Sequence, residues 1–142
     1  MLRGISPLIS PELLKVLAEM GHGDEILFTD AHYPQSGSSP IVLRADGLGI
    51  PDLLTATLAL LPLDQFSDWQ YGLMATVGDD PTPPIWERYA ALTNEVYPGA
   101  TPKFFERFDF YSYAKNTYAT VITGETAQYG NIILKKGVLK DA

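Results

Sequence analysis

His22 is the residue in this sequence whose type and surroundings best suit acid–base chemistry. It lies between Gly21 and Gly23, and two glycines leave the local backbone free and the imidazole uncovered. The unperturbed pKa of imidazole lies closest to neutrality of all side chains, so one ring can donate and accept a proton near pH 7. A histidine that follows a helix can also be a capping or packing residue, and the sequence leaves both roles open.

A second set of polar side chains occupies residues 30–34, with the sequence DAHYP. Asp30, His32 and Tyr33 offer a carboxylate, an imidazole and a phenol within a few residues. Such a dense set of hydrogen-bonding groups suits a polyol. A carboxylate at a strand end or in a turn would explain Asp30 equally well.

Arg107 and the tripeptide Tyr129-Gly130-Asn131 are the remaining candidates for ligand binding. Arg107 lies among aromatic residues, where its guanidinium could be a fixed fork of donors for hydroxyl groups, an ion-pair partner of Glu106 or a cation packed over a ring. Gly130 permits a turn that would aim the Tyr129 phenol, a backbone amide and the Asn131 side chain at one ligand. A plain β-turn is the alternative.

Other kinds of site have weaker support. His22, Asp30 and His32 could bind zinc or iron, but their spacing lacks the tight HxH or HxxxH patterns of metal ligands on rigid elements, so we expect no metal. Thiolate sites and disulfides are excluded because the chain has no cysteine. No GxSxG motif follows a strand, and residues 47–49 (GLG) lack the third glycine of a dinucleotide-binding loop.

Composition narrows the class of protein. The chain has 142 residues, 46% of them hydrophobic, and its 10 basic and 17 acidic residues give a net charge of -7. Nucleic acid is an improbable partner for so acidic a chain without a basic cluster. The longest apolar stretch, residues 53–63, is well short of the roughly 20 residues that cross a bilayer. We therefore expect a cytoplasmic protein with no membrane partner.

The elements that must position these residues alternate along the chain. Ser10 and Pro11 begin an amphipathic helix that Gly21 is placed to end. An apolar strand at residues 25–29 then puts Asp30 at a carboxyl end, where open α/β sheets bind ligands. Residues 34–40 are expected to form a mobile surface loop. Further strands are expected at 41–44, 71–77, 103–108, 118–123 and 131–135, and helices at 51–61, 84–96 and 110–116. This order predicts one three-layer α/β/α domain, residues 1–142, around a mixed, mostly parallel sheet.

Taken together, the quoted segments resemble the family that contains ribose pyranase and the fucose mutarotases. The resemblance spans nearly the whole chain, in residues 5–34, 44–51, 107–111 and 121–138. His32 and the run RFDFY at 107–111 favour the fucose branch over the ribose branch. The match is loosest at residues 35–40 and 79–84.

The resemblance implies an isomerase without a cofactor that interconverts the α and β anomers of L-fucose, with some pyranose–furanose exchange. It implies His22 as the catalytic residue and Asp30, Arg107, Tyr129, Gly130 and Asn131 as sugar-binding positions. It also implies ring-shaped homo-oligomers, for which a decamer is one expected size, with the site at a subunit boundary. Aromatic side chains in residues 108–118 are expected to contribute to that boundary.

Two other functions fit the same residues. One is ribose-pyranase activity as the principal role, and the other is non-catalytic sugar binding, as in a transport accessory protein.

Overall fold

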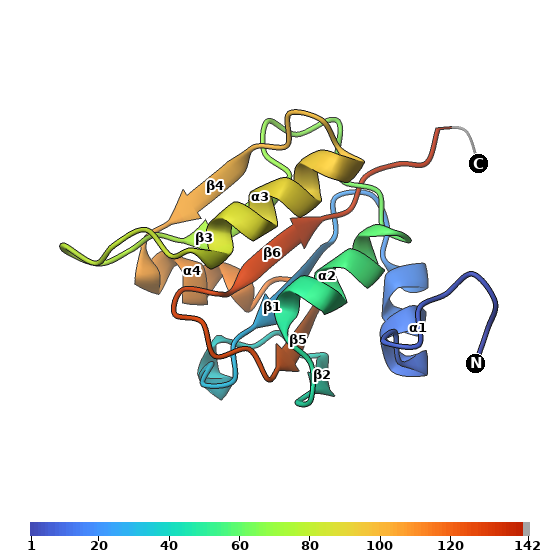
Figure 1. The fold of residues 1–142 in the computed structure, drawn as a ribbon, viewed down its shortest axis with the longest axis horizontal. Coiled ribbons are helices and arrows are strands. Elements are labelled where there is room, and N and C mark those ends of the chain that lie inside the picture. Colours follow the sequence, from blue (N-terminus) through green and yellow to red (C-terminus); the bar gives the residue numbers. More distant parts are fainter. Residues whose placement is uncertain (141–142) are drawn as a thin grey trace.

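The computed structural model describes residues 1–140, which form a six-stranded sheet with helices on both faces (Figure 1). The strands lie in the order β2-β5-β1-β6-β3-β4. Only β6 runs against its neighbours, because β1 and β3 both pair with it in antiparallel register while the other three pairs are parallel. The expectation of a mixed, mostly parallel sheet is confirmed. The strands are β1 (Glu25–Thr29), β2 (Val42–Ala45), β3 (Tyr71–Met74), β4 (Pro102–Phe105), β5 (Ala119–Thr123) and β6 (Ile132–Lys135).

The helices form two layers that cover opposite faces of this sheet. They are α1 (Pro11–Glu19), α2 (Ile50–Leu58), α3 (Ile85–Val96) and α4 (Arg107–Ala114), with a 3-10 turn, η1, at Gln35–Gly37. In Figure 1, α2 and α3 lie in front of the sheet and α4 lies behind it. The expected three-layer α/β/α architecture is confirmed.

Alternation along β1 separates the two halves of the core. Ile26 and Phe28 face the cluster formed with α1, α2 and α3, whereas Leu27 faces the cluster that contains Phe105 and Phe110. Successive side chains of a strand point to opposite faces, so a completely apolar strand is required when both faces are covered. No helix among residues 1–140 is long and apolar enough to cross a membrane.

The first helix begins as its sequence predicts and ends differently. The Ser10 hydroxyl accepts a hydrogen bond from Leu13 N–H at 3.1 Å, as expected of an N-cap. The helix ends one residue before Gly21, because Met20 adopts an extended backbone, and the glycine in the left-handed region is Gly23, with φ of 84°. Gly21 N–H instead donates to the Asp24 carboxylate at 2.8 Å, which stabilises the turn that carries His22.

The fourth strand is shorter than predicted, and this changes the setting of Arg107. The expected strand at 103–108 ends at Phe105, because the Glu106 carboxylate accepts hydrogen bonds from Phe108 N–H and Asp109 N–H at 3.0 and 3.2 Å and caps α4. Arg107 is therefore the first residue of a helix and not part of a strand.

The segment predicted as an open loop, residues 34–40, is tied to the sheet. The Ser39 and Thr120 hydroxyls lie 2.8 Å apart, and the Tyr33 hydroxyl donates to the carbonyl of Gly37 at 2.8 Å. A Cβ on Gly37 would lie 2.8 Å from that same hydroxyl, so the close approach requires glycine.

Candidate functional site

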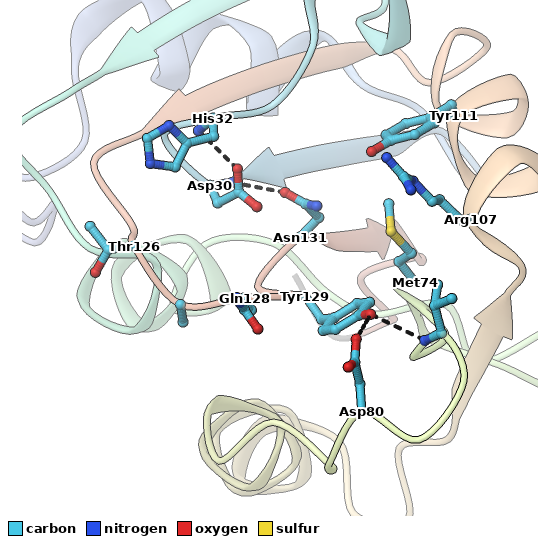
Figure 2. A pocket seen from close by; sticks show the side chains of 12 residues that line it. Asp30, His32, Met74, Asp80, Arg107, Tyr111, Thr126, Gln128, Tyr129 and Asn131 are labelled. Carbon is cyan, nitrogen blue, oxygen red and sulfur yellow. Dashed lines mark hydrogen bonds between the residues drawn. The ribbon is translucent and has the colours of Figure 1, made fainter.

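A pocket of about 480 Å³ opens at the carboxyl edge of the parallel strands. Its size is within the usual range for sites that bind small molecules. It lies where the chain leaves β1 and β3, where β6 begins and where α4 starts. Figure 2 shows the lining side chains: Asp30, His32, Met74, Val77, Asp80, Arg107, Tyr111, Thr126, Ala127, Gln128, Tyr129 and Asn131.

The strand order explains why the pocket forms at this edge. After β1 the chain builds β2 on one side of the sheet, and it then crosses to build β3 and β4 on the other side. The connections from β1 and β3 therefore diverge, and a crevice remains outside their carboxyl ends, which is where open α/β sheets bind ligands.

Asp30 and Asn131 are fixed against each other on the floor of this pocket. Asp30 N–H donates to Asn131 Oδ1 at 2.8 Å, and His32 N–H donates to Asp30 Oδ1 at 2.9 Å. Because the amide oxygen of Asn131 already accepts, its NH₂ group is left to donate. Burial raises the pKa of Asp30 above its ordinary value of 3.8, opposed by the hydrogen bond from His32. The pair thus offers a carboxylate acceptor beside an amide donor.

Tyr129 forms the opposite wall in a conformation that is uncommon for its residue type. Its φ is 54°, in the left-handed region. The phenol donates to the Asp80 carboxylate and accepts from Val77 N–H at 3.1 Å, while the carbonyl accepts from Trp86 Nε1 at 2.9 Å. The segment between β3 and α3 therefore fixes the phenol of Tyr129, and α3 itself fixes the carbonyl.

Gly130 lies between two lining residues and is itself buried. Its carbonyl accepts a hydrogen bond from the Tyr89 hydroxyl at 2.6 Å, so this group is directed into the core. A Cβ at Gly130 would lie 2.9 Å from the carbonyl oxygen of Ala127. Glycine thus allows the tight approach that places Tyr129 and Asn131 in one pocket.

Arg107 and Tyr111 enter the pocket from the first two turns of α4, where positions four residues apart share a face. The ion pair between Arg107 and Glu106 that the sequence allowed is absent within residues 1–140, because Glu106 caps the helix instead. Arg107 is exposed, and its guanidinium carbon lies 5.5 Å from the centre of the Phe108 ring. Its donors are thus available to a ligand.

His22 does not join these residues within one chain. It precedes β1, whereas Asp30 follows it, and five strand residues at about 3.3 Å each separate the two ends by roughly 16 Å. His22 Nε2 lies 2.9 Å from Asp64 Oδ1, and its ring meets the Phe66 ring edge-on at 5.2 Å. The imidazole is 46% exposed and the carboxylate only 6%. His22 is therefore an anchored imidazole at the amino edge of the sheet.

The same separation argues against the metal site considered from the sequence. His22 lies at the other end of β1 from Asp30 and His32, so the three do not converge within one chain. Residues 1–140 contain no group of three or more histidine, cysteine or acidic side chains that could hold a metal ion.

Sequence reasoning missed two carboxylates that the fold adds to the candidate groups. Asp80 lines the pocket, and Asp64 contacts His22. Tyr111, in the run RFDFY that favours the fucose branch, lines the pocket as well. Asp64 is 42 residues from His22 in the chain, so no local pattern could reveal the pair. The helical position of Tyr111, four residues after Arg107, would have revealed their shared face if the helix start had been placed correctly.

The fold and the pocket define an α/β protein with a site for a small polar ligand at the carboxyl edge of its sheet. Residues 3–139 match the RbsD / FucU transport protein family, and the chain belongs to that family.

Similar proteins include an L-fucose mutarotase of Actinobacillus pleuropneumoniae serotype 5b (strain L20), which is 54% identical over 141 residues, or 97% of each chain. The fucose mutarotase of Streptococcus pneumoniae, solved in complex with L-fucose, has a TM-score of 0.91 at 45% identity, covering 97% of this chain and 99% of that one. FucU of Bifidobacterium longum has a TM-score of 0.90 at 45% identity, covering 96% and 99%.

Proposed function

We propose that this protein is a mutarotase that interconverts the α and β anomers of L-fucose without a cofactor. The observation that carries the proposal is that one pocket is lined by four of the predicted sugar-binding residues, Asp30, Arg107, Tyr129 and Asn131. The similarity to L-fucose mutarotases over almost the full length supports the same reaction and substrate.

The reaction requires only proton transfers. A base takes the proton of the anomeric hydroxyl, the bond between C1 and the ring oxygen breaks, and an acid gives a proton to that oxygen. The open aldehyde then rotates about its bond to C2 and closes on the other face by the reverse steps. General acid–base help of this kind contributes about 10² to 10⁴-fold in rate.

The pocket supplies the groups that hold a sugar during these steps. Asp30 accepts hydrogen bonds from hydroxyls, Asn131 and Arg107 donate to sugar oxygens, and the Met74 side chain gives the wall an apolar surface suited to the methyl group of a 6-deoxy sugar.

We assign the acid–base role to His22, with Asp64 as the residue that orients it. When Nε2 carries the proton that it shares with Asp64, Nδ1 is left unprotonated and can act as the base. A buried carboxylate that fixes an imidazole in this way also favours the imidazolium formed after proton transfer.

His22 can reach a pocket only if a neighbouring copy presents it. The amino edge of one chain would then contact the carboxyl edge of the next, which is a head-to-tail contact of the kind that forms rings when the rotation between copies closes. Exposed apolar side chains at both edges support this arrangement: Phe66, beside His22, is 65% exposed, and Phe108, beside Arg107, is 67% exposed. The proposal includes a ring-shaped homo-oligomer, up to a decamer, and a cytoplasmic location.

His32 is the second candidate for the acid–base role, because it lines the pocket of its own chain. If His32 carries the reaction, the neighbouring copy is not needed for catalysis. In this alternative the proposed reaction is the same, and only the catalytic residue differs.

Exchange spectroscopy by NMR on L-fucose, D-ribose and D-galactose, with and without protein, tests the function. We expect anomer exchange of L-fucose to be accelerated most. Faster exchange of ribose than of fucose would favour ribose-pyranase activity. Sugar binding without acceleration on any of the three would leave a non-catalytic binding protein.

A further inference from the structure

The segment between β3 and α3 contacts the pocket through a carboxylate that the proposed reaction does not use. Figure 2 shows Asp80 directed at the hydroxyl of Tyr129. The N–H of Val77 donates to the same oxygen. Asp80 and Tyr129 are 49 residues apart in the chain, so only the fold brings them together.

Counting donors and acceptors shows what this arrangement does to the phenol. A tyrosine hydroxyl has one proton to donate, and its oxygen also accepts. Asp80 occupies the donor, and Val77 N–H occupies one lone pair. Because its one proton is committed to Asp80, Tyr129 can act toward a ligand only as an acceptor while Asp80 stays in place.

We propose that Asp80 is a positioning residue that fixes the Tyr129 hydroxyl as an acceptor for one sugar hydroxyl. This inference rests on the proposed sugar site and adds a determinant of its specificity. The substrate must present a hydroxyl that donates to Tyr129, and a sugar without that hydroxyl gains nothing from Asp80.

The surroundings of Tyr129 support a positioned phenol. Its left-handed backbone and the hydrogen bond from Trp86 to its carbonyl fix where the ring begins. The hydrogen bond to Asp80 fixes where the hydroxyl proton points. The same hydrogen bond raises the pKa of Tyr129, so the phenol stays protonated at neutral pH.

A double-mutant cycle tests whether Asp80 acts through Tyr129. The variants are Asp80→Ala, Tyr129→Phe and the two combined, with Asp79→Ala as the matched control, because Asp79 is exposed and outside the pocket lining. Calorimetry gives the Kd for L-fucose, and NMR exchange gives KM and kcat.

We expect Asp80→Ala to raise Kd and KM by roughly three- to tenfold, the factor that one neutral hydrogen bond contributes, with kcat changed less than about twofold. Adding Asp80→Ala to Tyr129→Phe should change neither value further, because the hydroxyl that Asp80 orients is gone. Asp80→Asn keeps an acceptor oxygen and should recover most of the affinity. Asp79→Ala should resemble the wild type.

Unchanged Kd in Asp80→Ala, or losses that add in the double variant, would overturn the inference. The binding measurement does not depend on catalysis. A wild-type protein that binds L-fucose without exchanging its anomers would refute the proposed function, but the Kd values of the variants would still test the role of Asp80. Absence of binding to L-fucose, D-ribose and D-galactose would overturn both.

Discussion

At the scale of single residues, the site depends on the ionisation of Asp30. Its carboxylate is held by His32 N–H and lies beside Asn131 in a partly buried position. Burial disfavours the charged form and raises the pKa of Asp30 above 3.8. The folded protein therefore binds a proton here more readily than the unfolded chain does.

This shift predicts a pH dependence of sugar binding. An ionised Asp30 can accept hydrogen bonds from sugar hydroxyls, so affinity should fall as pH is lowered, with a midpoint above 3.8. The stability of the fold changes with pH in the opposite direction. Because the pKa of Asp30 is higher in the folded protein than in the unfolded chain, stability falls as the pH rises from 3.8 to the pKa of the folded protein. Calorimetric titration with L-fucose between pH 4 and 8 checks the binding. In Asp30→Asn this midpoint should disappear, and its persistence would assign it to another group.

Arg107 should contribute to affinity and little to stability. It is exposed and has no ion-pair partner within residues 1–140. Arg107→Ala should weaken L-fucose binding by about tenfold or more, the effect of losing hydrogen bonds from a charged donor. Arg107→Lys should lose less, because a point charge replaces only part of the planar fork. A lowered melting temperature with unchanged Kd would show that Arg107 is structural instead.

At the scale of elements, the sequence correctly predicts those features of the helices and strands that neighbouring residues determine. The bounds of β1 follow from a short continuous apolar run, and the Ser10 N-cap follows from the capping preference of adjacent residues. The start of α4 was misplaced because an aromatic run has strand propensity, whereas the Glu106 cap determines the outcome. Asp30 was correctly placed at a strand end. The pairs Asp64–His22 and Asp80–Tyr129 join distant segments and could not be found without the fold.

Among the side chains that connect different elements, Glu125 is the one whose loss we expect to reduce stability and sugar affinity most. It accepts from Ile50 N–H at 3.1 Å and so caps α2, where Gly49 offers no side chain. Its other oxygen accepts from the N–H groups of Thr126 and Ala127, which line the pocket.

We expect Glu125→Ala to lower the free energy of unfolding by about 1–2 kcal/mol, the usual cost of a lost cap, and to weaken sugar binding as well. Urea denaturation and calorimetry measure the two effects. The control is Glu95→Ala, at an exposed site on α3, which should change neither. Stability lost without any loss of affinity would mean that Glu125 supports α2 alone.

At the scale of the whole molecule, the two halves of the proposed site lie at opposite edges of the sheet. The chain presents an anchored imidazole at one edge and a pocket at the other. Catalysis by His22 therefore depends on contact between copies.

Mixing two variants that are impaired at different parts of the site tests this dependence, at an L-fucose concentration too low to saturate Arg107→Ala. His22→Ala keeps an intact pocket, and Arg107→Ala keeps an intact imidazole. After the subunits are exchanged in equal amounts, roughly one quarter of head-to-tail junctions should combine both intact parts and recover a matching share of the exchange rate. Activity that stays at the level of the separate variants, in a mixture shown by mass spectrometry to contain hybrid rings, would contradict a shared site.

The most direct test of the central claim is the anomer exchange rate of L-fucose, measured by NMR for the wild type, His22→Ala and His32→Ala at equal sugar saturation. We predict strong acceleration by the wild type, exchange reduced to the uncatalysed rate in His22→Ala, and at most a modest loss in His32→Ala. Circular dichroism would establish that each variant is folded. Near-wild-type exchange in folded His22→Ala would contradict the assignment of His22, and a wild-type protein that leaves the exchange rate of bound L-fucose unaccelerated would contradict the function itself.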